Sequence, residues 1–159
     1  MSDDSVRGRC LCGAVEVEFK YPAFWAWHDH SEASRRAHGA AYATYVGVWR
    51  KNFRIAKGQR TVTRFEDEQT GATRTFCSKC GTPVLYERGR ARMVDVPRAL
   101  FDGRTGREPR YHLHIGEMRD WTYAGQNLVP LKGYPGVVWT GQKRKRKTIE
   151  FEDIDPLSS

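Results

Sequence analysis

The sequence predicts a mainly β domain, and three observations support this fold class. Residues 12–21, CGAVEVEFKY, alternate apolar and polar side chains, which is typical of a strand with one buried face. Residues 40–49, AAYATYVGVW, are rich in the aromatic and β-branched residues that strands favour. Glycine and proline separate a series of short segments further along the chain. A chain of 159 residues, 39% of them hydrophobic, is long enough to bury a core within one domain.

The remaining elements follow in chain order. One short helix is expected at residues 31–37, between the two strands just described. Further strands are expected at residues 61–65, 73–76, 84–87, 92–96 and 111–115. No internal repeat or linker divides these segments, so residues 1–140 are predicted to form one domain. Residues 141–159 are charged and then polar, and we expect a flexible tail there.

The chain is basic, with a net charge of +8 and a pI of about 9.5. Such a charge attracts anions through a long-range field. Much of it lies in residues 88–110 and in a basic block, KRKRK, that begins at Lys143 and ends at Lys147. A block of this kind near a terminus is most often solvated. Contact with nucleic acid or with a targeting receptor is the alternative.

The start of the chain, MSDDSVRGRC, lacks the apolar stretch of a signal peptide. No apolar run is long enough to cross a bilayer. A cytoplasmic setting without a membrane partner is therefore expected. Thiols stay reduced there, and they commonly bind metal or take part in chemistry.

The four cysteines form two close pairs, Cys10 with Cys12 and Cys77 with Cys80. On a strand, residues i and i+2 point to the same side, so the first pair can present both thiolates to one point. A C-x-x-C turn does the same for the second pair, and Gly81 can adopt the left-handed conformation that such a turn often needs. Two pairs of thiolates make a tetrahedral sulfur site of the kind that zinc favours.

Three other interpretations of the cysteines compete with a shared structural zinc. A redox C-x-x-C pair requires a helix amino terminus to lower its thiol pKa, whereas residues 82–86 after this pair have the pattern of a strand. A disulfide is disfavoured in the expected compartment. Unconnected core cysteines would not explain why both pairs occur. The sequence therefore predicts one zinc ion that joins the first strand to a distant hairpin.

Three motifs, together with their order and spacing, connect the chain to a known family. They are GRCLCGAV at residues 8–15, RRAHGA at residues 35–40 and FCSKCGTP at residues 76–83. On these motifs the chain resembles the family of glutathione-dependent formaldehyde-activating enzymes and centromere protein V, from about residue 8 to residue 130. The resemblance implies an Mss4-like fold of small coiled antiparallel sheets held by zinc. It also implies carbon–sulfur lyase activity on a glutathione or small-thiol adduct.

The resemblance implies a second zinc site as well, with the ligand pattern C-H-C-x-x-C just before the RRAHGA motif. Here Asp29, Ser31 and Ser34 stand at the three cysteine positions, and only His30 matches the pattern. A hydroxyl is a poor neutral ligand for zinc compared with a thiolate, so most of the affinity for the second ion should be lost. Without this ion the inherited reaction lacks its electrophile, and we expect the turnover to be weak or absent.

Two alternatives concern the same segment. A replacement site could use nitrogen and oxygen ligands from His28, Asp29, His30, Glu32 and His38. Otherwise these are polar surface residues on a remodelled loop, where Asp29 or Ser31 caps the following helix and Glu32 lies in its first turn.

Further residues suggest how ligands could bind. Arg35 and Arg36 could bind the carboxylate of a glutathione-like ligand, or they could form surface ion pairs. The aromatic residues of the first half fit the core and the wall of a cleft better than a base-stacking platform; they are Trp25, Trp27, Tyr42, Tyr45 and Trp49.

Three functions follow. The first is a degenerate family member that keeps the zinc scaffold and binds a ligand without turnover. The second is an active carbon–sulfur lyase, and the third is a nucleic-acid-associated module.

Overall fold

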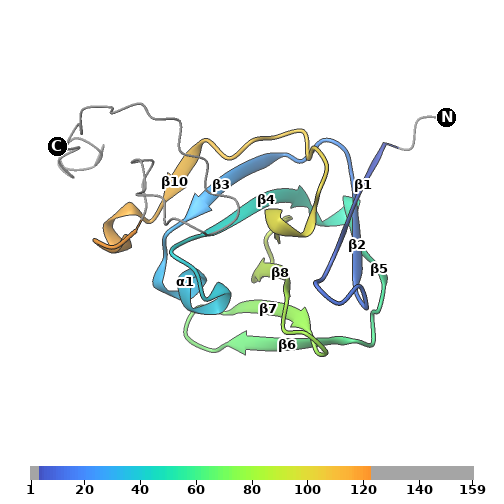
Figure 1. Cartoon of the computed structure of the whole chain (residues 1–159), viewed down its shortest axis with the longest axis horizontal. Helices are drawn as coiled ribbons and strands as arrows, with labels where there is room; N and C mark the ends of the chain where they lie inside the picture. Colours follow the sequence, from blue (N-terminus) through green and yellow to red (C-terminus); the bar gives the residue numbers. More distant parts are fainter. Residues whose placement is uncertain (1–3, 123–159) are drawn as a thin grey trace, which may run out of the picture. The chain divides into compact units, whose positions relative to one another are not determined.

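The computed structural model describes residues 4–122, and the mainly β prediction is confirmed there (Figure 1). The strands are β1 (Ser5–Arg9), β2 (Glu16–Lys20), β3 (Trp25–Asp29), β4 (Ala43–Trp49), β5 (Phe53–Lys57), β6 (Val62–Asp67), β7 (Ala72–Cys77), β8 (Pro83–Arg88), β9 (Met93–Pro97) and β10 (Tyr111–Leu113). The helices are α1 (Glu32–His38) and three short 3-10 turns, η1 (Arg50–Asn52), η2 (Arg98–Leu100) and η3 (Ile115–Glu117).

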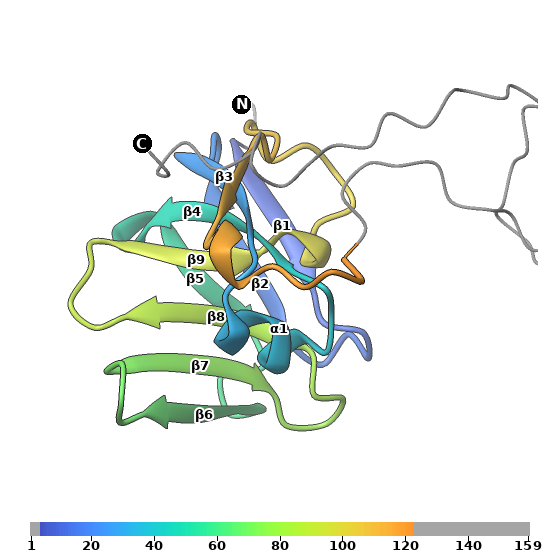
Figure 2. The same cartoon turned by 90° about the vertical axis from the view of Figure 1, so that its left-hand side faces the viewer.

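The strands form two sheets. The smaller sheet has the order β1-β2-β5, and the larger sheet has the order β10-β3-β4-β9-β8-β7-β6. Figure 2 shows the strands from β4 to β6 side by side in this order. Neighbouring strands are antiparallel except for β10, which pairs with β3 in parallel. Small antiparallel sheets were what the sequence predicted.

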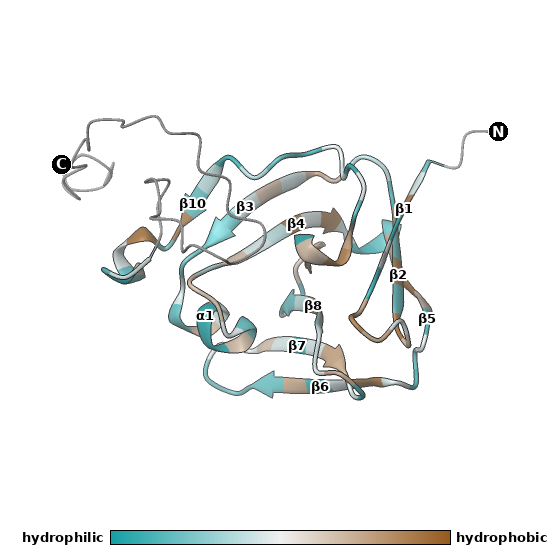
Figure 3. Ribbon diagram, in the orientation of Figure 1, coloured by the Kyte–Doolittle hydropathy of each residue, from teal (hydrophilic) through white to brown (hydrophobic). Residues whose placement is uncertain are grey.

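Side-chain alternation explains how the sheets share a core. On β2, Val17 and Phe19 are buried while Glu16 and Glu18 are half exposed, as the alternation predicted. The buried Val17 and Phe19 belong to one core cluster with Val46, Val84 and other residues of the larger sheet. Figure 3 shows hydrophobic colour along β4 and at the end of β7. Burial of these apolar side chains holds the two sheets together.

A second, smaller core cluster contains Trp27 and Tyr45, so the prediction of a core role is confirmed for these two aromatic residues. Trp25 packs against this cluster and is half buried. Trp49, at the end of β4, is exposed.

Some predicted boundaries were wrong, and three strands were missed. The first alternating segment becomes a strand only at Glu16, because residues 11–14 form a turn. The strands β1, β3 and β5 were not predicted. On β3, two buried neighbours, Ala26 and Trp27, break the strict alternation by which a half-buried strand is recognised.

Residues up to Met118 form one unit, and the described residues 119–122 belong to a second unit with its own turn. The predicted limits of the domain and tail, residues 1–140 and 141–159, and the block from Lys143 to Lys147 lie outside the described residues. Within residues 4–122, no helix has the length and apolar character that crossing a membrane requires.

Gly58 provides a test of the packing between the first turn and the chain after β5. Its φ is +77°, and a Cβ atom built there would lie 2.2 Å from the carbonyl oxygen of Ala14. Gly71 also has a positive φ, +66°, but a Cβ atom added to it would meet nothing within 4 Å. We expect Gly71→Ala to lose about 1–2 kcal/mol of unfolding free energy from backbone strain alone. Gly58→Ala should lose at least about 1 kcal/mol more, because the clash adds to the same strain. Urea unfolding measures both, and equal losses would contradict the described packing.

Candidate metal centre and its surroundings

The four cysteines lie in two similar turns. Cys10 and Cys12 lie in the turn between β1 and β2, and Cys77 and Cys80 lie where β7 turns into β8. In each turn a left-handed glycine follows the second cysteine, since Gly13 and Gly81 both have φ of +72°. The role predicted for Gly81 is confirmed. The prediction that Cys10 and Cys12 lie on a strand is wrong, because the glycine turn brings the two thiols together instead.

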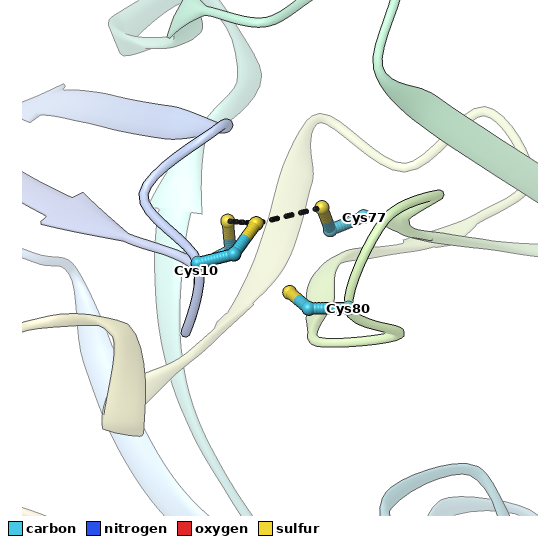
Figure 4. A group of neighbouring side chains, drawn as sticks. Cys10, Cys77 and Cys80 are labelled. Atoms are coloured by element: carbon cyan, nitrogen blue, oxygen red, sulfur yellow. Dashed lines mark hydrogen bonds between the residues drawn. The ribbon is translucent and has the colours of Figure 1, made fainter.

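The turns bring all four sulfur atoms within 4.8 Å of one another (Figure 4). The Sγ atoms of Cys10 and Cys12 are 3.6 Å apart, and those of Cys12 and Cys77 are 3.8 Å apart. Four thiolates at zinc–sulfur distances of about 2.3 Å would be separated by about 3.8 Å in a tetrahedron. All four cysteines are free of disulfides. The geometry therefore fits one tetrahedral metal ion.

Hydrogen bonds from the surrounding backbone and hydroxyl groups support negative charge on the sulfur atoms. The Val15 amide donates to Cys10 Sγ at 3.3 Å, and Cys80 Sγ lies 3.1 Å from the hydroxyl oxygen of Thr82. The same hydroxyl accepts a bond of 3.1 Å from the Leu11 amide, so Thr82 links the two turns directly.

The thiol pKa values show how a cation would stabilise this cluster. Hydrogen bonds from the Thr82 hydroxyl and amide lower the pKa of Cys80 to about 5. The pKa of Cys12 is raised to about 11: the Ala14 amide acts to lower it, but desolvation and the neighbouring thiols of Cys10 and Cys80 outweigh that amide. Four thiols this close cannot all ionise without a compensating charge, which a divalent ion would supply.

The part of the chain that the structure describes does not provide the helix amino terminus that a redox role for Cys77 and Cys80 would require. The residues after Cys80 lead into β8 and not into a helix, so no helix amino terminus lies beside the pair. Within residues 4–122, the cysteine cluster is the single group of three or more cysteine, histidine or acidic side chains whose ligand atoms come close enough to share an ion.

Asp29, Ser31 and Ser34 form the amino-terminal cap of α1. Ser31 Oγ accepts a bond from the Ser34 amide at 3.2 Å. The Asp29 carboxylate accepts from the Ser31 amide and from the Ser34 hydroxyl, both at 2.9 Å. The predicted capping role is confirmed. The prediction of polar surface residues is wrong for Asp29 and His30, which are buried, and it holds for Glu32, which is exposed.

His30 points away from this cap, toward the edge strand β10. Its Nε2 lies 2.8 Å from Nδ1 of His112, and its buried Nδ1 has no hydrogen-bond partner. Burial, followed by the nearby His112, lowers the pKa of His30 to about 4. His112 was missed in the sequence, because only the parallel pairing of β10 with β3 places it beside His28 and His30.

His38 and Tyr45 meet an arginine that the sequence did not single out. Nε2 of His38 lies 2.9 Å from the Tyr45 hydroxyl oxygen. Arg74 donates to the same oxygen at 3.2 Å and to Ser34 Oγ at 3.4 Å. Burial, followed by the charge of Arg74, lowers the pKa of His38 to about 4. A guanidinium group therefore lies directly beside the Asp29 and Ser34 cap.

The remaining candidates are dispersed around α1. Glu32 forms an ion pair of 2.6 Å with Arg36, which is 80% exposed. Arg35 is buried, and its Nε donates to the His30 carbonyl oxygen at 3.2 Å. Its Nη2 has no partner. Arg36 therefore forms a surface ion pair, which was one of the two roles predicted for the arginines. Binding of a ligand carboxylate by Arg35 stays a prediction.

Comparison with known proteins gives one family and one related structure. The family model for glutathione-dependent formaldehyde-activating enzyme matches residues 5–117. The crystal structure of a Rhodobacter sphaeroides protein is similar, with a TM-score of 0.53 and 24% identity, and the match covers 61% of this chain and 88% of that chain. At this identity the likeness concerns the fold. No curated protein matches the chain.

The lowered pKa of His38 predicts a pH dependence of stability. Its folded pKa of about 4 lies below the ordinary value of 6.5, so between these values the unfolded chain binds the proton more readily. This contribution is present above pH 6.5 and is lost as the pH falls toward 4. His38→Gln should reduce the loss of unfolding free energy between about pH 7 and pH 4.5 by roughly 2 kcal/mol.

Urea unfolding at a series of pH values measures this slope. His114→Gln is the control, because it removes an imidazole from an exposed position. If the His38→Gln and His114→Gln slopes coincide, His38 does not carry the effect.

Proposed function

Because the chain belongs to the glutathione-dependent formaldehyde-activating enzyme family, whose model matches residues 5–117 of 159, we propose that it is a zinc-binding member that no longer turns over the family substrate. In this proposal Cys10, Cys12, Cys77 and Cys80 hold one structural zinc ion, and the domain binds a ligand without carbon–sulfur chemistry. The convergence of the four sulfur atoms within 4.8 Å carries the proposal.

The donor set supports zinc as the ion. Four thiolates in tetrahedral positions are the usual ligands of structural zinc, and such closed sites leave no position for a substrate. The ion would connect a turn near residue 10 with a turn near residue 80, and it would offset the mutual repulsion of the thiolates. Its role is then to hold the smaller sheet against the β7–β8 hairpin.

The contacts around α1 support the loss of a second ion. Both oxygens of Asp29 already accept hydrogen bonds from the helix cap. His30 points to a different neighbour, His112. The guanidinium of Arg74 lies 3.4 Å from Ser34 Oγ, where its positive charge repels a divalent cation. The positions that match the family pattern therefore make a hydrogen-bonded cap beside an arginine.

An active lyase that uses nitrogen and oxygen ligands is the competing function. It would need groups such as His28, Asp29 and His30 to turn toward one point. His28 Nδ1 lies instead 2.9 Å from the Thr44 hydroxyl. Asp29 contacts the helix cap, whereas His30 contacts His112. The described contacts favour the ligand-binding function.

Metal content tests the structural part of the proposal. Elemental analysis of the purified chain should give about one zinc per chain, and Cys77→Ser should lose most of it. Ser78→Ala is the control, because Ser78 lies exposed in the same turn and offers no sulfur. Removing zinc with a chelator should lower the thermal midpoint, and adding zinc should restore it. A count near zero, or equal zinc in Cys77→Ser and wild type, would refute the structural zinc.

A gain of zinc after restoring cysteines tests the proposed loss of the second zinc site. The combined change Asp29→Cys, Ser31→Cys and Ser34→Cys should raise the zinc count toward two, because it restores thiolates at the family positions. Wild type should not accelerate the exchange of glutathione with formaldehyde, as measured by exchange NMR. A wild-type zinc count near two that drops in His30→Ala, or wild-type turnover, would favour the lyase instead.

A further inference from the structure

A cavity of about 320 Å³ opens beside α1 and the β6–β7–β8 strands. The polar side chains of its lining are those of His38, Tyr45, Arg74, Thr75 and Tyr86. The remaining lining is apolar and includes Phe65, Phe76 and Leu85. All of the lining residues lie within the unit that ends at Met118. A concave apolar space with a few grouped polar side chains is the usual form of a small-molecule site.

Arg74 brings a positive charge to this cavity without a close carboxylate. Its guanidinium stacks on Tyr86 at 4.1 Å from the ring centroid. Two of the five N–H groups of an arginine are used, toward Tyr45 and Ser34, through long bonds of 3.2 and 3.4 Å. Among residues 4–122, the side chain of Arg74 has no ion pair and no other hydrogen-bond partner.

The side chains that contact the Arg74 guanidinium are neutral, so no carboxylate of the described residues pairs with it directly. Arg74 can only donate, so the Tyr45 oxygen accepts from it, and the Tyr45 O–H group is free to donate to His38 Nε2. Burial raises the pKa of Tyr45 and lowers that of His38, which keeps both neutral near pH 7. Asp29 is held by the helix cap on the far side of Ser34. Asp67 accepts bonds from its own turn, and Asp95 accepts one from Arg88.

We propose that this cavity binds a small carboxylic acid with an apolar body, whose carboxylate pairs with Arg74 and whose body packs on Phe65 and Leu85. The assignment deepens the proposed function, and rests on it in taking the domain to bind a ligand without carbon–sulfur chemistry. A carboxylate suits the planar guanidinium fork, which can donate two parallel hydrogen bonds to it. The apolar lining disfavours a fully polar anion, because such a ligand would lose its hydration without gaining new partners.

Phenylacetate is the probe, and isothermal titration calorimetry of the zinc-loaded full chain is the measurement. Phenylacetamide has the same ring without the charge, acetate has the charge without the ring, and glutathione carries its carboxylates on a polar peptide. We expect phenylacetate to bind at least tenfold more tightly than each of the three, because only phenylacetate satisfies both ends of the cavity.

Two variants with a matched control locate the site. Arg74→Gln should weaken phenylacetate binding at least tenfold, and Arg74→Lys should keep part of the affinity because it keeps the charge. Arg64→Gln removes an equal charge from an exposed position on β6 next to Phe65 and should leave binding unchanged. The unfolding midpoint and zinc content of each variant show that it is folded.

Several outcomes would overturn the proposal. They are an absence of phenylacetate binding at millimolar concentration, equal binding of phenylacetamide, tighter binding of glutathione, and equal effects of Arg74→Gln and Arg64→Gln. The proposed function fails separately, on a wrong zinc count or on turnover of glutathione with formaldehyde. A chain could therefore fail one test and pass the other.

Discussion

The close approach of four sulfur atoms is the constraint on which the arrangement of the two sheets depends. Cys10 and Cys77 are separated by most of the domain in sequence, yet both are buried and belong to the same core cluster. Without a cation, ionised thiols at 3.6 to 3.8 Å repel one another, and some must stay protonated. With a cation, the same cluster becomes an attractive cross-link between the β1–β2 turn and the β7–β8 turn. The hydrogen bond from the Leu11 amide to Thr82 also joins the two turns.

Under the proposed function, the segment before α1 keeps the fold while it loses the chemistry of a metal site. A thiolate cluster would need a divalent ion to compensate its charge. Asp29 and Ser34 instead form a helix cap in which every charge-bearing oxygen has a donor. Arg74 then supplies a positive charge near the place where the family pattern would hold a metal. Unlike a metal ion, this cation is a side chain that cannot act as a Lewis acid.

Much of the fold and of the metal centre could be predicted because the signals are local. The alternation of Val17 and Phe19 with glutamates identified β2, and the spacing of Cys77 and Cys80 identified their turn. The turn that holds Cys10 and Cys12 was not predicted. The site around Arg74 could not be predicted in this way. Arg74 faces Tyr86 only through the register of β7 and β8, and His112 meets His30 only through the parallel pairing of β10 with β3. Such contacts are set by tertiary packing, so no spacing in the sequence indicates them.

The cysteine cluster and the cavity are connected through one strand. β7 carries Arg74 in its middle and ends at Cys77, and it is hydrogen-bonded to β6 on one side and to β8 on the other. Between Thr75 and Phe76 the pairing of β7 with β8 shifts in register, and this irregularity lets the end of β7 turn toward the sulfur cluster. Fixing Cys77 in the cluster therefore also fixes the position of the strand that presents Arg74. A rigidly held arginine pairs with a carboxylate at a smaller entropic cost than a mobile one, since less freedom remains to be lost. A metal ion bound by the four cysteines would thus hold the charged wall of the cavity in place without contact with the ligand.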